Sequence, residues 1–151
     1  MAPTFSLQPL LDLSHFQLDE AARKLGELIA GEQEASQRHS LLVTYREEYQ
    51  TRFLEAAKNG LGRSEWSNYS SFLARIDDAV IQAALSVSLT QQRTLAGQQN
   101  WIGRQGRVKA FDTLSERHHA QVTAQEQRAN QKISDEHTAR RHSEKSSDDN
   151  T

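Results

Sequence analysis

The sequence predicts an all-α protein that folds as a long two-helix antiparallel coiled-coil hairpin. Only 36% of its 151 residues are hydrophobic and its mean hydropathy is -0.77, so little apolar material is available for a globular core. Two prolines and seven glycines are few, and long stretches rich in Gln, Ala, Glu, Arg and Leu favour helix. Apolar residues also recur at heptad spacing on both sides of one glycine-containing segment, which predicts two paired helices.

The first predicted helix runs from about residue 7 to residue 58. Ser6 is placed to cap it, and Pro9 lies in its first turn, where a missing N–H costs nothing. The helix is expected to end at the loop 59–63, where two glycines can adopt a positive φ. Heptad positions a and d, which together form the seam, hold Leu11, Leu18, Ala21, Leu25, Leu28, Ala35, Leu42, Tyr49, Phe53 and Ala56. The seam also contains the weaker residues Ser14, Glu32, His39 and Arg46.

The second predicted helix begins at about residue 64, with Ser64 as its cap. Its seam holds Trp66, Tyr69, Leu73, Ile76, Val80, Ala83, Val87, Trp101, Val108 and Phe111, with weak points at Thr90, Thr94, Gly97 and Arg104. A short loop leaves the two helices as each other's only neighbours, so they are expected to pair antiparallel. Facing residues then have numbers that add up to about 123.

The predicted hairpin occupies residues 1–114, and residues 115–151 form a C-terminal extension. Beyond Leu114 the second helix has no first-helix residues left to pair with, and Val122 and Ile133 are isolated apolar residues in a polar stretch. We therefore expect a projecting helix that frays into a partly disordered tail.

Composition and motifs argue against several classes of function. The chain has no cysteine, and its 18 basic and 20 acidic residues are interspersed, so neither thiol chemistry nor nucleic-acid binding is expected. No glycine-rich phosphate loop or nucleophile with a neighbouring base is present, so we predict no enzyme activity, no cofactor and no small-molecule substrate. His118 and His119 are adjacent and face different sides of a helix, so no metal site is predicted.

No targeting or membrane segment is expected. The N-terminal residues lack a basic stretch followed by an apolar run, and no stretch is apolar for the ~18 residues that a membrane span needs.

Near the loop, additional apolar residues lie beside the seam, beyond those that the seam itself contains. They are the most informative feature for function. These residues share helical spacing on one face of each helix, and antiparallel pairing should bring the two faces together into a partly exposed strip. They are Leu42, Tyr45, Tyr49, Phe72, Ile76 and Ala79. Such residues either widen the contact between the helices or form a docking patch for a partner protein. The pattern alone leaves both readings open.

Several segments together resemble the flagellar FliJ family. They are Phe5-x-Leu7-x-x-Leu10-Leu11-x-Leu13, residues 19–28 (DEAARKLGEL), residues 45–49 (YREEY), Trp66-x-x-Tyr69-x-x-Phe72-Leu73-x-x-Ile76 and residues 109–117 (KAFDTLSER). The resemblance extends from residue 5 to about residue 140. The order and spacing of the segments, and the position of the loop, make the set more specific than any one motif.

The resemblance implies a soluble, non-enzymatic component of the flagellar type III export apparatus. Members of the family bind the ring-forming export ATPase FliI as a central stalk, the cytoplasmic domain of the export gate protein FlhA and, in some cases, export chaperones. The strip matches the family's gate-binding surface. Residues at the open end of the hairpin would sit in the ATPase ring: Phe5, Leu7, Leu10, Phe111 and Leu114. The expected location is the cytoplasm, with peripheral association at the cell membrane through these partners.

Two other classes stay open on the sequence alone. One is the equivalent stalk of a virulence-type type III secretion system, which would share the fold but not the partners. The other is a purely structural coiled coil that self-associates. The adaptor reading predicts a monomer in solution, whereas the structural reading predicts a stable dimer.

Overall fold

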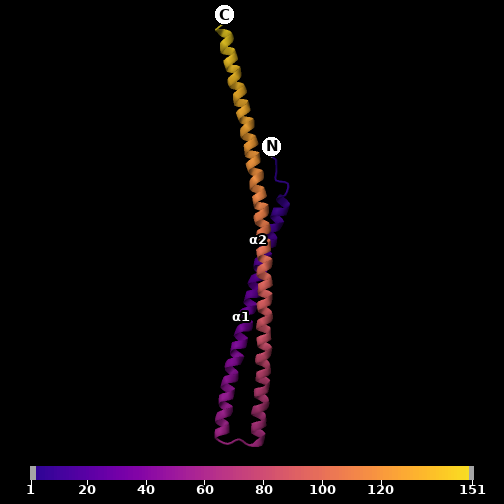
Figure 1. The fold of residues 1–151 in the computed structure, drawn as a ribbon, viewed down its shortest axis with the longest axis vertical. Helices are drawn as coiled ribbons and strands as arrows, with labels where there is room; N and C mark the ends of the chain where they lie inside the picture. The colour runs from indigo at the N-terminus through magenta and orange to yellow at the C-terminus, as the bar shows by residue number, and fades with distance from the viewer. Residues whose placement is uncertain (1–2, 150–151) are drawn as a thin grey trace. The chain divides into compact units, whose positions relative to one another are not determined.

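Two α-helices account for most of the chain. The computed structural model describes residues 3–149, in which α1 spans Gln8–Lys58 and α2 spans Arg63–Asp148. Residues 59–62 join them, and no strand occurs among the described residues. Figure 1 shows the two helices leaving the loop side by side and running in opposite directions. The predicted all-α antiparallel hairpin is therefore confirmed.

The helix ends differ slightly from those predicted. A turn in which the Gln8 amide bonds to the Phe5 carbonyl precedes α1, so the Leu7 carbonyl, one residue after Ser6, accepts the first helical bond from Leu11 at 2.9 Å. At α2 the first acceptor is the Gly62 carbonyl, bonded to the Trp66 amide at 2.9 Å, so the helix begins before Ser64. The predicted caps Ser6 and Ser64 are therefore wrong. In the loop only Gly60 has a positive φ, of 96°.

The described chain divides into two compact units, and each is described by itself. The loop unit is Gln17–Arg104, which includes the loop and both helix segments beside it. The terminal unit contains the described residues up to Phe16 and those from Gln105 onwards. This division follows contacts, and the predicted division into a hairpin of 1–114 and an extension of 115–151 stays a prediction.

Small side chains dominate the core of the loop unit. Ala21, Ile76 and Ala83 are its buried apolar residues, and Thr94 is buried with them. The Thr94 hydroxyl donates to the Leu28 carbonyl across the helix pair at 3.3 Å. A Cβ added at Gly97 would lie 2.6 Å from Leu28 Cδ1. Two of the seam positions predicted to be weak, Thr94 and Gly97, thus lie against Leu28 of the opposite helix.

A polar pair fixes the alignment of the helices nearer the loop. Arg46 lies on the predicted seam, where its Nε donates to Asp77 Oδ1 on α2 and its Nη1 donates to Gln50 Oε1 at 3.2 Å. The numbers of Arg46 and Asp77 add up to about 123, as the predicted pairing requires. This predicted weak point therefore has its polar groups satisfied and marks the register.

In the terminal unit, the start of α1 packs on α2. Leu11, Ser14 and Val108 are buried there, and the Ser14 hydroxyl donates to the Leu11 carbonyl at 2.7 Å. The Phe5 ring lies 5.5 Å from the His118 ring. All residues from 125 to 149 are exposed, although α2 remains helical to Asp148. As far as residue 149 the structure thus does not show the disorder predicted for the C-terminal tail, and residues 150–151 of that tail lie outside the described residues.

Two glycines of α2 should respond differently to substitution by alanine. Gly103 has open space where a Cβ would lie, so Gly103→Ala should raise the free energy of unfolding by about 0.5–1 kcal/mol through helix propensity. Gly97→Ala should gain less or lose stability, because Leu28 must move away from the new methyl group. Urea unfolding followed by circular dichroism measures both values. Equal stabilisation by the two substitutions would show that the contact between Leu28 and Gly97 does not constrain the pairing.

A double-mutant cycle tests the pairing of Arg46 with Asp77. Arg46→Ala and Asp77→Ala should show a coupling energy of about 0.5–1 kcal/mol, because both side chains are partly exposed and solvent screens them. The coupling should shrink as salt concentration rises. A matched cycle of Arg52→Ala with Asp77→Ala is the control and should give additive effects. If the effects in the Arg46 cycle were also additive, the Arg46–Asp77 pair would not help to fix the register.

Candidate partner-binding surfaces

Six aromatic rings lie together beside the loop. On α1 they are spaced by four residues, and on α2 by three, so each set lies on one face of its helix. The members are Tyr45, Tyr49 and Phe53 from α1 and Trp66, Tyr69 and Phe72 from α2. We call this set the aromatic ladder.

Each ring of the aromatic ladder touches at least one ring of the other helix. Tyr49 lies at the centre, 4.7 Å from the ring of Phe72 and 5.5 Å from that of Tyr69. Phe53 lies 4.8 Å from Trp66 and 5.4 Å from Tyr69. At the other end Tyr45 meets Phe72 edge-on at 6.5 Å. Aromatic pairs of this kind contribute about 0.5–1.5 kcal/mol each beyond their buried area, so the rings hold one another in place.

One side of the aromatic ladder is open to solvent. Tyr45 is 41% exposed, Phe72 38% and Trp66 51%. Aromatic rings that are both packed and exposed form a firm apolar surface rather than a closed core. A partner protein can therefore contact the ladder without unfolding the helices.

The predicted strip agrees with this surface in part. Tyr45, Tyr49 and Phe72 belong to the aromatic ladder, and Leu42 and Ala79 are half-buried residues of the same two helices. Ile76 is different, because it is only 5% exposed and lies in the core. The expectation that Ile76 is part of an exposed strip is wrong, since its position d points at the opposite helix.

Sequence reasoning missed three members of the ladder. Phe53, Trp66 and Tyr69 occupy positions a and d, which predicted ordinary core residues. Beside the loop, however, no further layer of the hairpin covers the last rings, and Trp66 stays half exposed. The available signal was the concentration of six aromatic residues within two heptads of the loop.

The environment of Tyr49 changes its acidity. Burial, followed by the neighbouring Tyr69 and Tyr45, raises the pKa of Tyr49 above its ordinary value of 10.0. Its phenol therefore ionises only at a higher pH than that of an ordinary tyrosine, and at neutral pH it can donate a hydrogen bond. The aromatic ladder thus offers polar tips as well as apolar ring faces.

The residues predicted to line the open end all lie in the terminal unit. Leu10 and Leu114 are exposed, whereas Phe5, Leu7 and Phe111 are half-buried. Leu13 and Phe16 are also exposed there, Phe16 to 64%, and sequence reasoning did not include them. Their positions c and f normally hold polar residues, which was the signal for a second apolar surface.

Comparisons with known proteins identify the family to which this chain is similar. Among the described residues, neither helix contains an apolar stretch long enough to cross a membrane. The sequence profile described as "Flagellar FliJ protein" matches residues 3–147. The flagellar FliJ protein of Salmonella typhi is 31% identical over 140 residues, which cover 93% of this chain and 95% of that protein. The corresponding protein of Escherichia coli strain K12 is 29% identical with the same coverage. The chain therefore belongs to the FliJ family of flagellar proteins.

Proposed function

We propose that this chain is a non-enzymatic adaptor of flagellar protein export. Its aromatic ladder binds the cytoplasmic domain of the export gate protein FlhA, and its terminal unit binds the ring of the export ATPase FliI. Membership of the family supports the flagellar setting. Export chaperones are a further class of partner, and the chain works in the cytoplasm with peripheral association at the membrane through its partners.

The exposed side of the aromatic ladder is the observation that carries the proposal. Two paired helices need apolar residues in their seam, but they do not need Tyr45 and Phe72 outside it, each more than a third exposed. Tyrosine and tryptophan are enriched among residues that dominate protein–protein affinity. Phenol groups at the tips of apolar rings also suit a surface that is exposed to solvent in the free protein and buried when a partner binds.

The packing of the ladder favours tight binding. Tyr49 is held by ring contacts on both sides, and Phe72 is held by two tyrosines of α1. Immobilising a flexible side chain on binding costs about 0.5–1.5 kcal/mol. Rings that are already ordered avoid much of this loss, so the exposed area converts more fully into affinity.

The terminal unit supplies the second proposed contact. Leu10 and Leu114 both occupy heptad position g, and positions of this class flank each other in an antiparallel pair. Both side chains are exposed, as are Leu13 and Phe16 on α1. An apolar surface of this kind can contact the inner wall of a protein ring.

Removing the ladder's rings should abolish binding to the gate. The triple variant Tyr45→Ala, Tyr49→Ala, Phe72→Ala should bind the FlhA cytoplasmic domain at least about 30-fold more weakly, as expected for residues that dominate an interface. Its helicity and its binding to FliI should persist, because the rest of the seam is intact. Titration calorimetry against each purified partner measures both affinities.

The control removes exposed apolar groups from another face. Leu41 and Leu54 of α1 are 71% and 55% exposed, and Leu41→Ala with Leu54→Ala should leave binding to the gate unchanged. If the triple variant bound the gate as well as the unaltered chain, the ladder would have no role there. A loss of equal size in the control variant would show that general apolar contact, rather than the ladder, is responsible.

The two contacts should be separable. Leu10→Ser with Leu114→Ser should weaken binding to FliI roughly tenfold, since two exposed leucines would leave an apolar interface. Binding to the FlhA domain should not change. Leu95→Ser with Ile102→Ser, which alters exposed aliphatic residues of the loop unit, is the matched control. Retention of full FliI binding by the Leu10 and Leu114 variant would remove the terminal unit from the proposal.

A further inference from the structure

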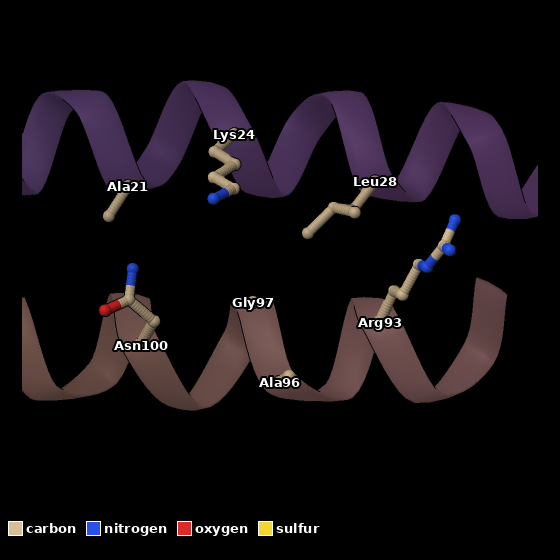
Figure 2. A pocket seen from close by; sticks show the side chains of 7 residues that line it. All are labelled: Ala21, Lys24, Leu28, Arg93, Ala96, Gly97 and Asn100. Atoms are coloured by element: carbon tan, nitrogen blue, oxygen red, sulfur yellow. The ribbon is translucent and has the colours of Figure 1, made fainter. Parts of the chain in front are cut away.

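A hollow lies between the two helices of the loop unit, away from the loop. Its volume is about 350 Å³, which falls in the range of ligand pockets. Figure 2 shows the residues that line it: Ala21, Lys24 and Leu28 from α1, and Arg93, Ala96, Gly97 and Asn100 from α2. None of these residues belongs to the aromatic ladder or to the open end.

The hollow exists because its floor is made of small residues. Ala21, Ala96 and Gly97 carry at most one carbon beyond the backbone, so they leave room between the helices. Leu28 reaches Gly97 and closes the floor there, as its clash with an added Cβ shows. The surface at the base of the hollow is therefore apolar and held in shape by helix packing.

The rim of the hollow carries two cationic side chains and one neutral amide that can donate hydrogen bonds. Figure 2 shows Lys24 and Asn100 extending toward opposite helices near one end, and Arg93 extending toward α1 at the other end beyond Leu28. No acidic residue lines the hollow. Within residues 3–149, neither Lys24 nor Arg93 forms an ion pair, although Glu20 lies one helical turn from Lys24. Both charges are therefore available to a ligand.

The hollow also shares a heptad position with the aromatic ladder. Lys24 and Tyr45 both occupy position g of α1, and Arg93 and Phe72 both occupy position g of α2. Residues at this position flank each other in an antiparallel pair, so within the loop unit the cations and the exposed rings belong to one edge. Along this edge Tyr45 and Phe72 lie nearer the loop than Lys24 and Arg93 do.

We propose that this hollow docks an acidic peptide segment of a partner protein. One carboxylate of the segment meets Lys24 and Asn100, a second meets Arg93, and an apolar side chain between them rests on Leu28 and Ala96. The pattern of the rim, with cations at two ends of an apolar floor, calls for acidic residues on either side of an apolar one. A bare anion would bind such exposed cations weakly, because water screens them. This site goes beyond the proposed ladder contact and does not depend on it.

Titration of the full isotope-labelled chain with defined peptides tests the site. The probe is a capped helical peptide of about 20 residues, long enough to form helix alone, with leucines flanked by glutamates on one face. Its control replaces each glutamate by glutamine. The glutamate peptide should shift the NMR signals of Ala96, Gly97 and the Asn100 side-chain amide, and should bind about tenfold more tightly than the control.

Variants of the chain locate the binding. Lys24→Gln with Arg93→Gln should remove the preference for glutamate, and Ala96→Leu should weaken both peptides by filling the floor. The charge-matched control is Arg23→Gln with Arg75→Gln, which alters exposed arginines outside the hollow and should retain the preference.

Three results would overturn the proposal. Equal binding of the two peptides would exclude charge recognition, and equal loss in the Arg23 and Arg75 variant would place the effect outside the hollow. Inorganic phosphate that shifts the same signals and displaces the peptide at similar concentration would indicate a simple anion site. The triple variant of the ladder should bind the peptide normally, so failure here and failure of the gate contact are distinguishable.

Discussion

The register of α1 against α2 decides which side chains meet along the two helices. A connection of only residues 59–62 joins the helices, and Gly60 supplies the positive φ that lets the chain reverse so quickly. A slip of one heptad would separate Arg46 from Asp77 and would face Leu28 with a residue larger than Gly97. The same slip would break the ring contacts of Tyr49. Both proposed sites of the loop unit therefore depend on this one alignment.

Positions that are poor for coiled-coil packing are the positions that define the register. A uniform apolar seam stabilises many alignments about equally, whereas a buried polar group or a gap tolerates few. Thr94 finds its acceptor at Leu28 only in this alignment, and Gly97 accommodates the same leucine. The seam thus contains fewer apolar contacts than a uniform one, but it stabilises a single register. That arrangement is needed because ring stacking and charge placement both require accuracy of a few ångströms.

The heptad pattern was sufficient to predict the helices, their antiparallel pairing and the register. The residues that precede each helix were harder to predict. Ser6 and Ser64 are good N-cap residues in isolation, but the backbone turns at the helix starts place Leu7 and Gly62 at the N-cap positions instead. Burial of Ile76 could be inferred from its position d, whereas the exposure of Trp66 depends on where the hairpin stops. The hollow at Gly97 could not be predicted, because it depends on how far apart small residues hold two backbones.

Photocrosslinking in motile cells tests the central claim that the exposed edge of the aromatic ladder is a docking surface. A photoreactive phenylalanine analogue placed at position 72, and separately at position 41 on the other face, would be activated in motile cells. We expect the analogue at position 72 to crosslink to the export gate protein and the one at position 41 not to. Crosslinks to the gate from position 41 alone, or from neither position, would contradict the claim.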